Sequence, residues 1–135
     1  MTVVDTSVWA AFFNGESTLH AAELDHLLAT GGSVGIIPII LTEVLQGFRT
    51  DSGFEEAKKL LTQLPLFHPS IATYIEAARL YRALRHRGVT VRGTIDCLIA
   101  QSCIETSALL LTADRDFRLI AEHTKLQLYQ TAIPD

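Results

Sequence analysis

Five acidic residues stand at positions where an acid is costly or unexpected, and they give the first indication of chemistry: Asp5, Glu43, Asp96, Asp114 and Asp116. Asp5 ends the apolar stretch MTVVD, while Asp114 and Asp116 follow the apolar stretch ALLLT in the run TADRDF. In open parallel sheets, ligands bind beyond the carboxyl ends of the strands. Asp5 and Asp114 are therefore expected at one functional edge, although a polar loop would also explain Asp114.

Glu43 lies in an apolar segment, IIPIILTEVL, where only Thr42 and Glu43 have polar side chains. On a helix Glu43 would share a face with Ile39, Ile40 and Gly47. A carboxylate in such surroundings costs several kcal/mol unless a cation or hydrogen bonds compensate it. The alternative is a Glu side chain that extends to solvent.

Asp96 lies in the first turn expected of the helix TIDCLIAQSCIE, after a predicted cap at Thr94. An acid there favours the helix dipole by roughly 0.3–1 kcal/mol, which is a sufficient structural explanation. Asp96 also lines up with the inward stripe of Ile99, Ala100 and Cys103, which capping does not require. Asp116 has a similar alternative, as the cap of the next helix.

Acids that converge at one sheet edge would repel one another and raise each other's pKa values. A divalent cation removes this conflict, and an all-oxygen ligand set favours Mg²⁺ or Mn²⁺ over zinc. Such sites suit phosphodiester hydrolysis, in which a bound water is activated and charge on the phosphate is neutralised. One carboxylate can also accept the proton of the water.

Length and composition predict a single domain over residues 1–135, with a mass of 14.9 kDa. Hydrophobic residues make up 48% and charged residues 19%, which favours a globular fold over disorder. No apolar run reaches the ~18–20 residues that span a bilayer, and no signal peptide is evident. We therefore predict a cytoplasmic protein without a membrane partner, in which Cys97 and Cys103 are reduced core thiols.

The net charge of −4 argues against a nucleic-acid partner, but its distribution does not. Setting the five acids aside changes the net charge to +1. Five arginines also crowd one segment: Arg79, Arg82, Arg85, Arg87 and Arg92. The simpler interpretation of this run is a solvated helix face.

Apolar strands alternate with helices, which predicts an α/β domain with a mostly parallel sheet covered by helices on both faces. The expected strands are 1–5, 34–37, 64–68, 108–112 and 126–129, of which 64–68 is weak. The expected helices are 7–13, 18–30, 38–48, 53–63, 70–87, 94–106 and 116–123. Ser70 is the expected cap of the long helix, Asp51 or Ser52 that of 53–63, and Gly31-Gly32 a helix stop.

Two other patterns carry less weight. GGSVG at residues 31–35 matches the serine hydrolase elbow, but that motif needs a strand before it and a helix after it, the reverse of the order expected here. The five histidines have no paired metal-ligand spacing and are taken as surface or core polar residues.

Taken together, these motifs resemble the PIN-domain ribonucleases, specifically the VapC-type toxins of bacterial toxin–antitoxin pairs. The resemblance covers essentially the whole chain and is carried by VVDTSVW, LTEVLQG, TIDCLIA and LLTADRDF, in this order. It implies a PIN-like sheet of about five strands and Mg²⁺- or Mn²⁺-dependent endoribonuclease activity. It also implies a homodimer and a cognate VapB-type antitoxin that silences the toxin.

The resemblance assigns catalytic acids and metal ligands to the positions found above. Asp5, Glu43, Asp96 and Asp114 would be the catalytic acids, and Asp116 an auxiliary acid that joins Asp5, Asp96 and Asp114 as a metal ligand. Thr6 would hold the carboxylate of Asp5, and Thr112 supplies a second supporting hydroxyl. With this fold, Arg92, Arg85 and Arg87 become candidates for binding RNA phosphates, Arg92 first, with an intramolecular salt bridge as the alternative.

Two alternatives remain open from the sequence. A phosphatase could use Asp5 as a nucleophile. Haloacid-dehalogenase-like phosphatases, however, require a second Asp two residues after the first, where this chain has Ser7. The other alternative is a catalytically silent PIN-like module that only binds RNA. Because such a module does not need its acids, the intact set in this chain argues against it.

Overall fold

The strand β1 (Thr2–Val4) lies inside a parallel sheet and delivers the first acid to the edge of that sheet. The structure is a computed structural model that describes residues 1–131. β1 pairs with β2 (Val34–Gly35) on one side and with β3 (Leu109–Leu111) on the other. β4 (Gln127–Leu128) pairs with β3, so the order is β2-β1-β3-β4, with every pair parallel.

The sheet has four strands rather than the five that we predicted. The segment 64–68 forms only one parallel bridge, between Leu66 and Ile36. Two hydrogen bonds hold it, from the Ile36 amide to the Pro65 carbonyl and from the Phe67 amide to the Ile36 carbonyl, both 2.9 Å. Pro65 has no amide hydrogen to donate, which limits a longer ladder at this edge.

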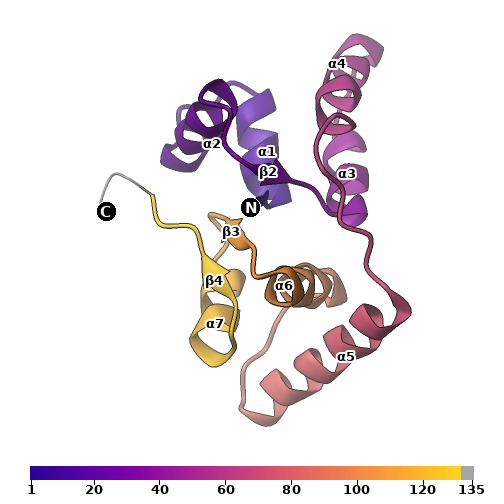
Figure 1. Ribbon diagram of the computed structural model, residues 1–135, viewed down its shortest axis with the longest axis vertical. Helices are drawn as coiled ribbons and strands as arrows, with labels where there is room; N and C mark the ends of the chain where they lie inside the picture. The colour runs from indigo at the N-terminus through magenta and orange to yellow at the C-terminus, as the bar shows by residue number, and fades with distance from the viewer. Residues whose placement is uncertain (132–135) are drawn as a thin grey trace.

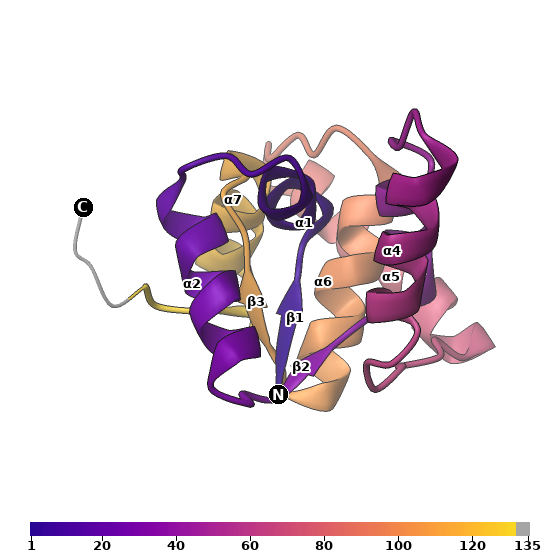
Figure 2. The same cartoon turned by 90° about the horizontal axis from the view of Figure 1, so that it is seen from above.

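Seven helices surround the sheet within residues 1–131 (Figure 1). They are α1 (Thr6–Phe13), α2 (Leu19–Ala29), α3 (Pro38–Leu45), α4 (Asp51–Leu61), α5 (Ile71–His86), α6 (Thr94–Thr106) and α7 (Arg115–His123). Figure 2 shows α2 and α7 on one side of the central strands and α6, with α4 and α5 beyond it, on the other. The predicted α/β architecture with helices on both faces is therefore confirmed.

The core lies on both faces of the sheet. Leu110 and Leu111 of β3 are fully buried, as are Trp9 of α1 and Ile120 of α7. Both cysteines are buried and free, as predicted, and burial raises the pKa of Cys103 to about 12. None of the helices within residues 1–131 is long and apolar enough to cross a membrane.

Several helix starts differ from the predictions. Thr50, not Asp51 or Ser52, caps α4, because its hydroxyl accepts the Gly53 amide at 3.1 Å. Thr94 is the first residue of α6, after Gly93, which provides no side-chain cap. The prediction of Ser70 as the cap of α5 is confirmed, and α2 ends just before Gly31, whose φ of 72° favours glycine.

Two leucines test the importance of the central strand. Leu110 is 0% exposed in β3, whereas Leu119 on α7 is 39% exposed. We expect Leu110→Ala to lower the free energy of unfolding by roughly 2–5 kcal/mol, because it opens a cavity between the sheet and its helices. Leu119→Ala, the matched control, should cost less than about 1 kcal/mol. Urea unfolding measures both values, and equal losses would contradict this account of the core.

Candidate metal-binding active site

Asp5 is held at the edge of the sheet by its backbone and by its side chain. Its amide donates to the Leu111 carbonyl at 3.0 Å, which extends the β1–β3 pairing and brings Asp5 beside Thr112. One carboxylate oxygen, Oδ2, accepts the hydroxyls of Thr112 at 2.6 Å and Ser7 at 2.8 Å, and Oδ1 accepts the Ser7 amide at 3.1 Å. Asp5 is only 5% exposed, and these donors offset the cost of burying its charge.

The two hydroxyls after Asp5 have different partners from those predicted. Ser7, which we expected only to begin a helix, binds Asp5 and is the supporting residue that sequence reasoning missed. Thr6, which we expected to hold Asp5, instead donates to Oε1 of Glu43 at 2.8 Å. The sequence did contain a signal for Ser7, because a helix-capping Asp accepts the amide two or three residues on.

Thr112 joins the ends of β1 and β3. While its hydroxyl donates to Asp5, the same oxygen accepts the Asp114 amide at 3.0 Å. Asp114 then caps α7, with its Oδ1 accepting the Asp116 amide at 2.9 Å, so Asp114 rather than Asp116 is the cap of this helix. Thr112 thus contacts two of the predicted acids, which is the geometry expected of a supporting hydroxyl.

Three of the five acids form a compact group. Carboxylate oxygens of Asp96, Asp114 and Asp116 all lie within 4.8 Å of one another. Asp5 and Glu43 are outside this group, but they are close enough for their charges to act on Asp96. The structure therefore brings all five predicted acids to one neighbourhood and three of them into direct proximity.

The pKa of Asp96 reflects the closeness of these carboxylates. Burial is the largest cause, and together with the negative charges of Asp114, Asp5, Asp116 and Glu43, in that order of importance, it raises the pKa of Asp96 from 3.8 to about 6. A cation placed among these oxygens would favour the ionised form and oppose the shift. The donor set, carboxylate oxygens only, is the chemistry that Mg²⁺ and Mn²⁺ prefer.

The predicted RNA-binding arginines have intramolecular partners. Nε of Arg92 lies 3.3 Å from Oδ2 of Asp116, although the Arg92 side chain is 83% exposed. Arg87 donates to the His123 carbonyl at 3.3 Å, and the Arg85 guanidinium lies 5.7 Å from the centroid of the Tyr81 ring. The salt bridge that was the alternative for Arg92 is present, and exposed pairs of this kind contribute little to stability.

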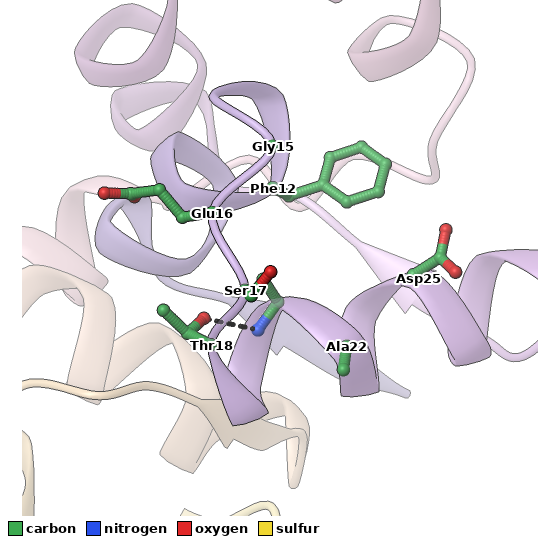
Figure 3. A pocket seen from close by; sticks show the side chains of 8 residues that line it. Phe12, Gly15, Glu16, Ser17, Thr18, Ala22 and Asp25 are labelled. Atoms are coloured by element: carbon green, nitrogen blue, oxygen red, sulfur yellow. Dashed lines mark hydrogen bonds between the residues drawn. The ribbon is translucent and has the colours of Figure 1, made fainter.

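A large pocket of the molecule does not belong to this site. It has a volume of about 470 Å³ and lies between the end of α1 and the start of α2, lined by Phe12, Glu16, Thr18 and Asp25 among others (Figure 3). None of the five predicted acids lines it, and its own charged groups are the carboxylates of Glu16 and Asp25. The volume of a pocket alone therefore does not identify the candidate active site.

Sequence comparison places the chain among known proteins. The family model for the PIN domain matches residues 2–123. The VapC ribonuclease Mb1587 of Mycobacterium bovis and the ribonuclease VapC11 of Mycobacterium tuberculosis are each 34% identical to this chain over 129 residues, which cover 94% of this chain and 96% of theirs. The chain belongs to the PIN-domain family, and within it to the VapC-type ribonucleases.

Solved structures agree on the fold. The structure of VapBC2 from Rickettsia felis, bound to a DNA fragment from its promoter, matches with a TM-score of 0.75 at 21% identity and covers 95% of this chain and 96% of that one. The structure of VapBC-1 from nontypeable Haemophilus influenzae gives a TM-score of 0.73 at 16% identity and covers 98% of both chains. At these identities the match confirms the PIN-like fold.

The raised pKa of Asp96 predicts an unusual stability profile. Because the folded pKa exceeds the unfolded value, the folded protein binds more protons between pH 3.8 and about 6, and its stability falls as the pH rises through this window. We expect Asp96→Asn to stabilise the metal-free protein at pH 7.5 by about 1 kcal/mol, a value reduced for the partial exposure of the side chain.

Thermal unfolding in the presence of a chelator, at pH 7.5 and at pH 5, measures this effect. The gain should shrink at pH 5, where the wild-type carboxyl is already largely protonated. Asp25→Asn, which removes an exposed acid of α2, is the control and should change little. A variant that is destabilised at pH 7.5, or a gain that is equal at both pH values, would contradict the assignment.

Proposed function

We propose that this protein is an endoribonuclease that requires Mg²⁺ or Mn²⁺ and acts as the toxin of a toxin–antitoxin pair. The observation that carries the proposal is the group of Asp96, Asp114 and Asp116, with oxygens within 4.8 Å and a raised pKa at Asp96. The relatives from both mycobacteria are named ribonucleases, which supports RNA as the substrate.

Four carboxylates are proposed to hold the ion. Asp96, Asp114 and Asp116 face one another, and Asp5 is fixed beside them through Thr112. When bound, a divalent cation supplies an acidified water and neutralises charge on the scissile phosphate. The hydroxyls of Ser7 and Thr112 both donate to Oδ2 of Asp5, whereas Oδ1 accepts only the Ser7 amide among the donors within residues 1–131. Oδ1 is therefore the less engaged of the two oxygens.

Glu43 suits the role of proton acceptor. Thr6 holds its Oε1 at 2.8 Å, and no residue within 1–131 donates a hydrogen bond to Oε2. A half-buried carboxylate with one oxygen fixed and the other available can orient a water and accept its proton. This gives Glu43 a role distinct from the three grouped acids.

Arg92 is proposed to contact RNA at the rim of the site. Its Nε pairs with Asp116, but the guanidinium has further N–H groups and its side chain is largely exposed. A phosphate of the substrate can therefore bind Arg92 without breaking its bond to Asp116. Arg85 and Arg87 remain candidates for weaker contacts further along the chain.

The partners follow from the relatives. The two solved neighbours described above are named as VapBC complexes, which supports a VapB-type antitoxin as the partner of this chain. We propose that the protein is a homodimer and that it acts in the cytoplasm, as the family resemblance implies.

The purified protein should cut single-stranded RNA in the presence of Mg²⁺ or Mn²⁺ and stop when a chelator is added. Asp5→Asn and Asp96→Asn should each reduce the rate by roughly a hundredfold or more, because several kcal/mol of metal-dependent stabilisation is lost. Gel analysis of labelled RNA with and without each metal measures the rates. Asp25→Asn should retain the wild-type rate.

Three results would count against the proposal. Full activity of Asp5→Asn or Asp96→Asn would remove these residues from the metal site. An intact, metal-loaded protein that binds RNA but never cuts it would support the silent-module alternative. Turnover of phosphomonoesters with a phosphate attached to Asp5 would support the phosphatase alternative.

A further inference from the structure

A second pocket lies directly beside the acidic site, and Thr112 is the one residue of the proposed catalytic site among those that line it. It has a volume of about 250 Å³, and we call it the rim pocket. It is formed where the start of α2, the helix α7 and the segment after β4 come together, and the residues that matter here are His20, Thr112, Arg118, Tyr129 and Gln130. These come from four separate parts of the chain, so no sequence motif reveals the pocket.

The rim pocket shares a wall with the acidic site. Thr112 lines the pocket, and its hydroxyl donates to Asp5 at 2.6 Å. Asp114 is bound to the same hydroxyl oxygen through its amide. An RNA strand bound at the acidic residues could therefore also reach the rim pocket without any rearrangement of the sheet.

The wall formed by Tyr129 is fixed. Its amide donates to the Leu110 carbonyl of β3 at 2.8 Å, and its hydroxyl donates to Oε2 of Glu23 at 3.3 Å. Glu23 is only 6% exposed, and burial together with the negative charge of Glu23 raises the pKa of Tyr129. The phenol therefore stays protonated, and its ring is held as a preformed part of the wall.

The basic groups of the rim pocket have no partner in the described part of the chain. Within residues 1–131 neither the exposed Arg118 side chain nor the half-buried His20 side chain has a hydrogen bond or an ion pair. Arg79 and Arg92, by contrast, are each paired with an acid. An uncommitted guanidinium close to a group of carboxylates is suited to a ligand that carries its own negative charge.

We infer that the rim pocket binds one nucleotide of the RNA substrate, adjacent to the phosphodiester that is cut. The inference rests on the proposed function and adds a recognition subsite to it. Arg118 and His20 bind the phosphate, while the Tyr129 ring and the Gln130 amide contact the base. Single-stranded RNA is recognised by this combination of cation, aromatic ring and hydrogen-bonding side chain.

The size and chemistry of the pocket favour a nucleotide over other ligands. Its volume is below the roughly 300–1,000 Å³ of pockets that enclose a drug-sized ligand, so one base is a better match than a longer segment. Most of the residues that line it are polar, which disfavours the apolar anchors on which protein partners rely. A polar site next to metal-binding acids instead suits the polyanion that those acids are proposed to cut.

The test uses the full chain with Asp96→Asn, which blocks cleavage, in the presence of a chelator. Two probes are titrated: the four nucleoside 5′-monophosphates, followed by NMR, and a fluorescent single-stranded RNA 12-mer of random sequence, followed by anisotropy. We expect the monophosphates to shift the amide signals of residues 128–131 and of α7. Arg118→Ala should weaken binding of the 12-mer about tenfold, because a hydrogen bond to a charged group is lost.

Two further variants separate phosphate contact from base contact. Arg118→Ala should reduce the salt dependence of RNA binding, with the slope of log K falling by about 0.7 for one lost phosphate contact on a single strand. Arg118→Lys should restore part of the affinity. Gln130→Ala should change the order in which the four monophosphates bind, with little effect on the salt slope.

Arg82→Ala is the matched control, since it removes an exposed arginine of α5, a helix that contributes no residue to the rim pocket. An Arg118→Ala protein that binds RNA like Arg82→Ala, or monophosphates that leave residues 128–131 unshifted, would overturn the inference. These results are independent of cleavage. If the wild-type protein cuts RNA but the pocket binds no nucleotide, only this inference fails; if nucleotides bind the pocket but no RNA is ever cut, only the proposed function fails.

Discussion

Mutual repulsion between carboxylates is the interaction that the rest of this structure has to balance. Asp96 experiences it most clearly, since four other acids raise its pKa in addition to its burial. The acids can stay close because they lie on different elements whose positions are set by the sheet and by the apolar core. Burial of residues such as Leu110, Leu111 and Ile120 stabilises the arrangement by far more than the repulsion opposes it.

Hydroxyl donors reduce the cost of this arrangement at two of the five acids. Asp5 accepts hydrogen bonds from Ser7 and Thr112, and Glu43 accepts one from Thr6. Asp96 receives no such bond from a residue within 1–131, and burial and the neighbouring negative charges raise its pKa. A divalent cation that binds the folded protein, and not the unfolded chain, would stabilise the fold by mass action. The crowding of carboxylates that costs stability in the metal-free protein is therefore also what gives the site its affinity for the ion.

The positions of the acids could be predicted from the sequence because each one breaks a local rule. Asp5 and Asp114 end apolar strands, while Glu43 and Asp96 interrupt apolar helix faces, and one sequence is enough to see this. The partners of Thr6 and Ser7 could not be assigned as reliably, since successive helical residues point about 100° apart and only the three-dimensional arrangement decides which hydroxyl meets which acid. Residues 64–68 had the pattern of a weak strand, but the segment with Pro65 forms only a single bridge.

Helix α2 separates two pockets of opposite electrostatic character. The pocket of about 470 Å³ presents Glu16 and Asp25, whereas the rim pocket of about 250 Å³ presents His20 and Arg118. A polyanion is repelled from the first and attracted to the second, so the smaller pocket is the better site for RNA. The net charge of −4 therefore says little about the partner of this protein, because acidic and basic groups are distributed unevenly over its pockets, and the local field at each pocket decides what binds there.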